Sequence, residues 1–388
     1  MNADRACECS KVELDLFSVP PLNTSMERSN QCVYHPISSL TDSGPIEFNV
    51  SGSSDEYIDI GRTMLYIKLQ VTQKNSNDLI DTAKVAPVNL LFPSLFSQID
   101  IKLKDTLITP SAHTYPYKAY LETLLSYGND AKESQLSSEL WNTDVGDFNA
   151  VDPYAEGNDN TGMKNRAYYI AKSKTLELMG RPHCDLFLQD RYLINGVDMY
   201  VKLIRSNETF HLMSIDDNVA TKILDARLHV RKVKIHLTIA LQHSKLLDTG
   251  TTVKYPIRRS VVSSFTIPKG SLSFNKENVV TGQMPRRIVI GFVRNAAFNG
   301  SFKINPFNFE HFQLDYLSLN VGSQIFPSHP LKPDFENDEC IRSYMTLFEG
   351  TGMLNDNRGH GVTREQFRKG YTLYAFDMTP DMCEGSHL

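Results

Sequence analysis

The stretch "SLFSQIDIKLKDTLITP", Ser94–Pro110, returns in similar form as "HFQLDYLSLNVGSQIFP", His311–Pro327. In both, an aromatic residue precedes an apolar run that alternates around an Asp, and a polar turn leads to further apolar residues that end at a Pro. In the first copy the apolar positions from Ile99 to Leu103 share one side of an extended chain, which predicts a strand. The Lys104–Thr106 step predicts a turn, so each copy is expected to form a β-hairpin.

The elements around the two stretches also recur in one order. "TMLYIKLQV", residues 63–71, alternates with period two and predicts a strand, and "RRIVIGFV", 286–293, stands in its place in the second half. "YPYKAYLETLLSYG", 115–128, predicts a helix with Pro in its first turn and Gly at its end, and "CIRSYMTLFEGTG", 340–352, takes its place. This repeated order indicates internal duplication. Two β-rich copies, each with a helix inserted in a loop, fit two jelly rolls side by side.

Short strands with long polar connections predict an all-β fold, a double jelly roll made of two antiparallel sandwiches with short helices in loops. A polar stretch at 142–165 predicts a surface loop. The further expected strands cover 174–180, 184–190, 197–206, 226–230 and 233–241, with a bulge near Arg231–Lys232. The expected divisions are an extended N-terminal arm at 1–44, a first jelly roll at 45–241, a linker at 242–254 and a second jelly roll at 255–388.

Composition restricts the class of protein. The 388 residues are 41% hydrophobic and 22% charged, which is enough for a folded core. The net charge is −5. A protein that mainly coats nucleic acid needs a basic surface, so the charge argues against that class.

The cysteines and the termini bear on the cell compartment. The six cysteines are spread thinly and predict free thiols rather than a zinc site or a disulfide framework: Cys7, Cys9, Cys32, Cys184, Cys340 and Cys383. The first 17 residues lack the apolar core of a secretory signal, and no stretch of about 18 apolar residues occurs. We therefore expect a product that is made inside the cell, is not secreted and does not span a membrane.

No catalytic, cofactor-binding or metal-binding residues are expected. Phosphate-loop, zinc-protease, serine-hydrolase and dinucleotide motifs are absent from the sequence. His229, His236 and His243 recur every seven residues, which alternates faces on a strand and prevents convergence on one ion. His183 and Cys184 are adjacent and would point to opposite faces, so they do not form a nucleophile pair.

Two further stretches are given structural interpretations. "RLHVRKVKIH", 227–236, could touch nucleic acid or an acidic neighbour, but is better explained as the solvated face of a strand. His360 lies between two glycines in "NDNRGHGVTREQF", which predicts a mobile loop.

Several stretches together resemble the major capsid proteins of Polinton (Maverick) transposons and adintoviruses. They include "PISSLTDSGPIEF", "YIDIGRTMLYIKLQV", "APVNLLFPSLFSQIDIKL", "TYPYKAYLETLLSYG", "LINGVDMYVKLIRS" and "KGYTLYAFDMTPD", and the resemblance runs from about residue 12 onward. It implies a double jelly-roll subunit, homotrimers that form pseudo-hexagonal capsomers, and an icosahedral shell around double-stranded DNA. The implied location is the virion. The implied partners are other copies of the chain and penton or minor capsid proteins, with packaged DNA contacted only indirectly.

The second half ends earlier than the first. No counterpart follows residue 388 for the strand at Asp198–Ser206 or for the closing strand after it. The sequence therefore suggests a second jelly roll without its last strands, with an exposed apolar edge at Tyr371–Phe376. The alternative function is a cellular β-sandwich binding module taken over from a mobile element, which would need a concave site with clustered aromatic residues. The only Trp, Trp141, does not indicate such a site.

Overall fold

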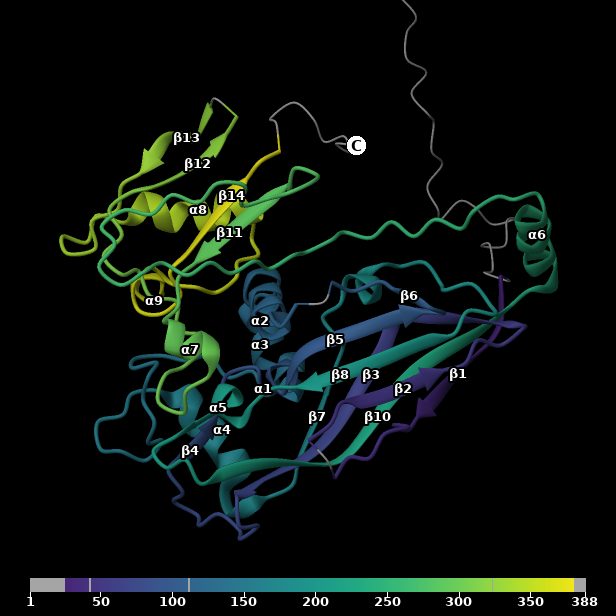
Figure 1. The fold of residues 1–388 in the computed structure, drawn as a ribbon, viewed down its shortest axis with the longest axis horizontal. Helices are drawn as coiled ribbons and strands as arrows, with labels where there is room; N and C mark the ends of the chain where they lie inside the picture. The colour runs from purple at the N-terminus through teal and green to yellow at the C-terminus, as the bar shows by residue number, and fades with distance from the viewer. Residues whose placement is uncertain (1–24, 42, 111, 323, 380–388) are drawn as a thin grey trace, which may run out of the picture.

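The computed structural model describes residues 25–41, 43–110, 112–322 and 324–379 (Figure 1). Paired strands build its framework and its helices are short, so the expected all-β class is confirmed. The strands are β1 Met26–Tyr34, β2 Ile46–Val50, β3 Glu56–Gln73, β4 Val85–Pro87, β5 Phe96–Leu103, β6 Thr106–Leu107, β7 Leu176–Gly180, β8 Met199–Arg205, β9 Leu212–Ser214, β10 Val219–Ile235, β11 Arg287–Gly291, β12 Leu317–Val321, β13 Gln324–Leu331 and β14 Leu373–Asp377. The α-helices are α1 Leu91–Ser94, α2 Tyr115–Ser126, α3 Asn129–Glu133, α4 Thr161–Ile170, α5 Glu208–His211, α6 Leu237–Asp248, α7 Asn295–Asn299, α8 Ile341–Thr351 and α9 Arg364–Arg368. The 3-10 helices are η2 Gln135–Glu139, η3 Ala171–Ser173 and η4 Asp185–Leu188.

Eight strands of the first half form a jelly roll. One sheet has the order β1-β10-β3-β7 and the other the order β2-β8-β5-β6. Numbered one to eight along the chain, without the short β4 and β9, these strands run 1-8-3-6 and 2-7-4-5. Every connection except the β5–β6 hairpin therefore crosses from one sheet to the other, which is the wiring of a jelly roll.

The alternation seen in the sequence places the first core between these sheets. On β3, Leu65, Ile67 and Leu69 are buried while the side chains between them are partly exposed. On β5, Ile99 and Ile101 are buried, and the chain turns at Lys104 into β6 as expected. Each such side chain contributes roughly 1.5–3 kcal/mol when it leaves water, so these two faces stabilise the sandwich.

The second half carries two strand pairs and a helix. β11 pairs with β14 and β12 pairs with β13, while α8 packs against both β11 and β14. The strand expected at 286–293, the hairpin and the helix at 340–352 are confirmed. The hairpin starts at Leu317 because Phe312 and Gln313 have positive φ angles of 46° and 52°, which interrupt an extended strand. Between α6 and β11 the chain has no helix or strand.

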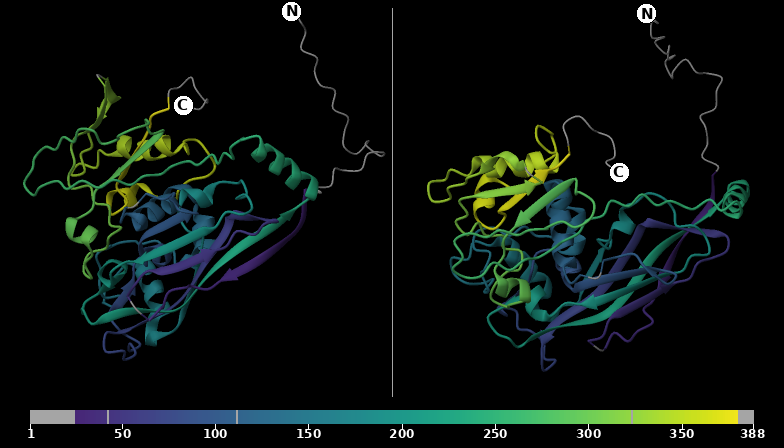
Figure 2. Two further views of the ribbon diagram at one scale, coloured as in Figure 1. Left: turned by 45° about the vertical axis from the view of Figure 1, so that its right-hand side comes forward. Right: turned by 45° about the horizontal axis from the view of Figure 1, so that its top comes forward.

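Helix α2 joins the two halves through aromatic stacking. Tyr117 stacks on Phe298 with ring centroids 5.4 Å apart, and Tyr120 stacks on Phe307 at 4.1 Å. These side chains belong to a second core that contains residues of both halves. Both views of Figure 2 show the second half beside α2 at one end of the sandwich.

Two expected strands have a different structure. Residues 185–188 form the 3-10 helix η4, because Leu186 and Phe187 are both buried and consecutive strand residues cannot face one core. β10 ends at Ile235, and α6 begins after His236, whose ring Nδ1 accepts a hydrogen bond from the Thr238 N–H at 3.3 Å. The expected bulge is confirmed as a register shift between His229 and Arg231 within one long strand.

Two other expectations also need correction. Residues 26–34, expected in an extended arm, form β1 at the edge of the first sheet, where they pair with β10. The expected loop at 142–165 ends in α4, because the Asn160 side chain accepts a hydrogen bond from the Met163 N–H at 3.0 Å and caps the helix.

The apolar edge expected at Tyr371–Phe376 is not exposed. All six residues are buried, because β14 pairs with β11 and is covered by α8. Gly350 makes this close packing possible, since a Cβ at that position would lie 2.4 Å from the Ala375 carbonyl carbon.

Candidate functional site

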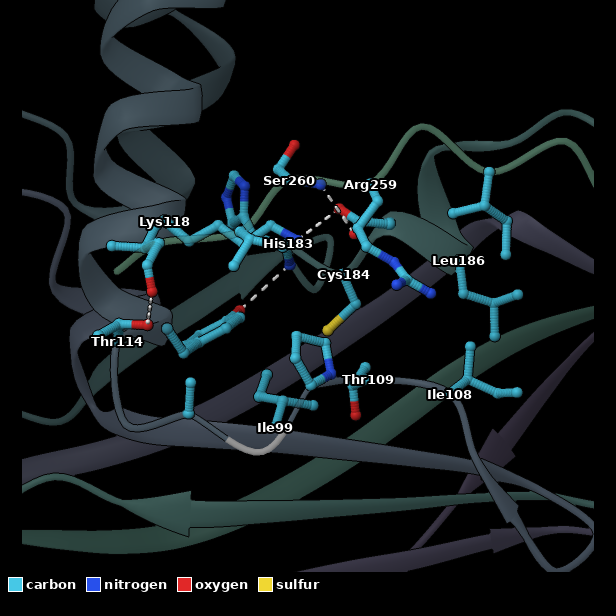
Figure 3. A pocket seen from close by; sticks show the side chains of 17 residues that line it. Ile99, Ile108, Thr109, Thr114, Lys118, His183, Cys184, Leu186, Arg259 and Ser260 are labelled. Carbon is cyan, nitrogen blue, oxygen red and sulfur yellow. Dashed lines mark hydrogen bonds and ion pairs between the residues drawn. The ribbon is translucent and has the colours of Figure 1, made fainter. Parts of the chain in front are cut away.

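A small cavity lies where the segment after α6 crosses the first sandwich (Figure 3). Its volume is about 130 Å³, whereas sites for drug-sized ligands are typically about 300–1,000 Å³. Ionisable and polar side chains from α2, from the start of η4 and the two residues before it, and from the crossing segment line it, among them Lys118, His183, Cys184, Asp185, Arg259 and Ser260. The cavity is therefore smaller than a typical site for a drug-sized ligand.

Asp185 holds the crossing segment to the sandwich. Its carboxylate pairs with the Lys118 ammonium and accepts a hydrogen bond from the Ser260 N–H at 3.1 Å. The Thr114 hydroxyl donates to the Val262 carbonyl at 3.4 Å, next to the same cavity. Because both oxygens of Asp185 already have partners, this carboxylate has a structural role.

His183 is held between two carboxylates. Its Nδ1 lies 3.0 Å from Glu122 Oε2, and its Nε2 lies 3.7 Å from Glu139 Oε2, too far for a hydrogen bond. Burial alone would lower the pKa of His183, but the hydrogen bond to Glu122 and the charge of Glu139 raise it to about 9. The imidazole is therefore protonated at neutral pH.

Cys184 does not form a nucleophile pair with His183. Burial raises the pKa of the Cys184 thiol to about 12, so no thiolate is available at neutral pH. The neighbouring imidazole is engaged by Glu122 and carries a proton, so it cannot act as a base. Cys32, Cys184 and Cys340 are free thiols, while Cys7, Cys9 and Cys383 lie outside the described residues.

Asp144 and Arg166 form the most deeply buried ion pair among the described residues. The Arg166 guanidinium donates to Asp144 Oδ1 at 2.5 Å, to the Pro87 carbonyl at 2.8 Å and to the Asn142 carbonyl. The second half reaches the same site, since Asn305 donates to Asp144 Oδ2 at 3.2 Å and the Tyr371 hydroxyl donates to the Asp144 carbonyl at 3.1 Å. A pair with all these partners satisfied is a fixed connection between the halves. Asp144 lies in the stretch at 142–165 that was expected to be a surface loop, and Arg166 follows directly after it.

Lys132 lies buried beside His360. Its ammonium donates to the Leu124 carbonyl at 2.9 Å and to the His360 carbonyl at 2.5 Å, and it faces the Trp141 ring with its nitrogen 5.3 Å from the ring centroid. Burial lowers the pKa of Lys132 to about 8, and burial together with the Lys132 charge lowers the pKa of His360 to about 4. The expectation of a mobile loop at His360 is therefore wrong. The "TREQ" motif, Thr363–Gln366, which caps α9, was the local signal of order.

The three regularly spaced histidines do not meet. His229 contacts the Tyr66 ring, His236 caps α6, and His243 Nδ1 lies 2.9 Å from the Tyr57 hydroxyl. The described residues contain no group of three or more His, Cys, Asp or Glu placed to hold a metal. The helices in the described part of the chain include none long and apolar enough to cross a bilayer.

The basic stretch at 227–236 is largely neutralised within the fold. Arg227 pairs with Asp225 at 2.7 Å, Arg231 with Asp59 at 3.5 Å, and Lys234 with Glu27 at 3.4 Å. This agrees with the interpretation as the solvated face of a strand.

No protein-family model matches the chain. One curated protein, Uncharacterized protein F54H12.2 of Caenorhabditis elegans, is 25% identical to it over 376 residues, which cover 93% of this chain and 86% of the relative. The similarity extends over nearly the whole sequence.

The chain also has structural similarity to solved viral structures, at TM-scores below 0.5. The Sputnik virophage structure gives a TM-score of 0.40 with 10% identity, covering 60% of this chain and 53% of that chain. The mavirus major capsid protein gives 0.31 with 13% identity over 75% and 55%, and the Faustovirus major capsid protein gives 0.33 with 7% identity over 61% and 59%. The chain thus spans less than two thirds of the length of these structures. The fold class rests on the strand pairing described above.

Proposed function

We propose that the chain is a structural capsid protein that works by self-association and carries out no catalysis. The observation that carries the proposal is the eight-stranded jelly roll of the first half, followed by a second copy of its strand, hairpin and helix in the same order. The buried ionisable groups fit a structural role, because Asp144, Lys132 and His183 all have hydrogen-bond or ion-pair partners within the fold.

The proposed assembly is a homotrimer in which two lobes per chain, the jelly roll from β1 to β10 and the second half at 255–388, give a nearly sixfold ring. A ring of this kind closes through heterologous contacts between neighbouring copies. Such capsomers would tile an icosahedral shell in the virion, together with penton and minor capsid proteins, and would enclose double-stranded DNA without binding its bases. The proposed lineage is that of the Polinton and adintovirus capsid proteins, on the strength of the sequence resemblance.

Sedimentation velocity of the purified chain from about 0.5 to 50 μM tests this function. A capsid protein should sediment as a trimer or larger species at the upper end. A cellular binding module should remain a monomer throughout and should bind a ligand from an array of glycans or peptides. A monomer at every concentration would contradict the proposal whether or not a ligand is found.

A further inference from the structure

The segment between α6 and β11 repeats the sequence of a buried strand. "GPIEFN", Gly44–Asn49, contains most of β2, and "GSLSFN", Gly270–Asn275, has the same Gly, branched aliphatic, Phe and Asn at the same spacing. The first stretch precedes β3 and the second precedes β11, so each holds the same place in its half.

The pairing of β11 supports this equivalence. β7 runs antiparallel to β3, with Leu65 opposite Gly180 and Leu69 opposite Leu176. β14 likewise runs antiparallel to β11. The sequence "TLYAFD" at 372–377, which contains β14, resembles "TLELMG" at 175–180, which contains β7. β11 and β14 of the second half therefore correspond to β3 and β7 of the first. The stretch before β11 accordingly corresponds to β2.

The two stretches differ sharply in burial. Ile46 and Phe48 on β2 are 0% exposed and pair with Leu203 and Val201 of β8. Their counterparts Leu272 and Phe274 are 104% and 44% exposed. Among the described residues, no backbone hydrogen bond joins 272–285 to another segment. A strand-like sequence with exposed apolar residues and unpaired backbone groups is a template for a further strand.

We propose that Ser271–Asn275 takes up an antiparallel strand from the N-terminal segment of a second copy of this chain, "KVELDLFSV", Lys11–Val19. This segment alternates as an added strand should, with Val12, Leu14 and Leu16 on one side. The inference rests on the proposed function only in requiring that copies associate.

Charge favours this occupant. Glu13 and Asp15 lie on the other side of the proposed strand from Leu14. The stretch that contains the receiving segment, residues 254–287, is strongly basic. Its only acidic residue is Glu277, and its basic residues are Lys254, Arg258, Arg259, Lys269, Lys276, Arg286 and Arg287. Opposite charges steer such segments together and fix which partner is chosen.

The position of the segment indicates a neighbouring copy rather than the same chain. The Ser25 carbonyl accepts a hydrogen bond from the His236 N–H at 2.9 Å, so Ser25 lies where α6 begins. Val262, in the segment that follows α6, contacts Thr114 at the start of α2. The later residues continue to β11, and Figure 1 shows α6 and β11 on opposite sides of the molecule.

Hydrogen exchange of the full chain, read together with its mass in native conditions, tests the inference. In associated protein the amides of 272–275 should exchange at least about 100-fold more slowly than free amides, and dilution to the monomer should remove this protection. Ser273→Pro, which removes an N–H from the ladder, and Leu14→Asp should each abolish the protection. The matched variants Ser273→Ala and Ser10→Asp should keep it.

Each alternative outcome has a defined meaning. Association with fast exchange at 272–275, or protection that survives Leu14→Asp, overturns the strand-addition site and leaves the proposed function intact. Protection that persists in the diluted monomer assigns the strand to the chain's own arm and overturns the role of the second copy. Failure of the wild-type chain to associate at any concentration contradicts the proposed function itself.

Discussion

The Asp144 carboxylate lies 2.5 Å from the Arg166 guanidinium, and both side chains are almost fully buried, at 1% and 2% exposure. Arg166 stands on α4 of the first half, while Asn305 and Tyr371 bring the second half to the same aspartate. This pair ties the two halves together at one buried point.

Replacing Asp144 with Asn should destabilise the protein by about 3–5 kcal/mol, because the Arg166 charge would be left buried without its partner. Urea unfolding at pH 7 measures the loss. The exposed pair Lys172–Asp81, 2.9 Å apart, provides the control, and Asp81→Asn should cost less than about 1 kcal/mol. Equal losses in the two variants would contradict a special role for Asp144.

Phe307→Ala should cost about 3–5 kcal/mol, since this fully buried ring stacks on Tyr120 across the contact between the halves. Thermal or urea unfolding, monitored by near-UV circular dichroism, measures this loss of stability. Phe312, which is 54% exposed, serves as the matched aromatic, and Phe312→Ala should change stability by no more than about 0.5 kcal/mol.

The raised pKa of His183 should make part of the stability depend on pH. The folded value of about 9 lies above the ordinary 6.5, so this contribution is complete below pH 6.5 and is lost as pH rises toward 9. His183→Gln should therefore cost on the order of 3 kcal/mol at pH 6 and much less at pH 9. The exposed His35→Gln variant should show no such difference between the two pH values.

Lys132 should act in the opposite direction. Its folded pKa of about 8 lies below the ordinary 10.5, so the buried cation costs stability below pH 8 and that cost disappears as pH rises toward 10.5. Lys132→Met should remove an increase on the order of 3 kcal/mol between pH 7.5 and pH 10. The stabilisation from His183 decreases over part of the same pH range. The quantity to compare is therefore the free energy of unfolding of the wild type minus that of the variant at each pH, with Lys74→Met as the exposed control. An unchanged pH slope in the Lys132 variant would refute this assignment.

Period-two patterns allowed much of the sandwich to be predicted from sequence. The faces of β3 and β5, the Lys104 turn, α2 and α8 follow from local spacing and turn chemistry, and the structure confirms them. The sequence at 184–190 predicts a strand because Leu186, Phe187 and Leu188 are apolar in any conformation, and only the burial of the consecutive Leu186 and Phe187 distinguishes the tight turn η4. α6 was missed because its capping residue, His236, is not a usual cap.

The buried polar groups could not be predicted, because they depend on contacts between distant segments. Asp144 meets Asn305 and Lys132 meets His360 across the two halves, and no local pattern reports such pairs. His183 is adjacent to Cys184 in the sequence, whereas its charged neighbours in the structure are Glu122 and Glu139. Sequence spacing alone gives no signal for that cluster.

Electron cryomicroscopy of the purified, associated chain tests the capsid proposal most directly. We expect three-fold rings of six lobes, with two lobes from every copy. Particles that contain a single copy of the chain, or closed dimers with two-fold symmetry, would contradict the capsid proposal.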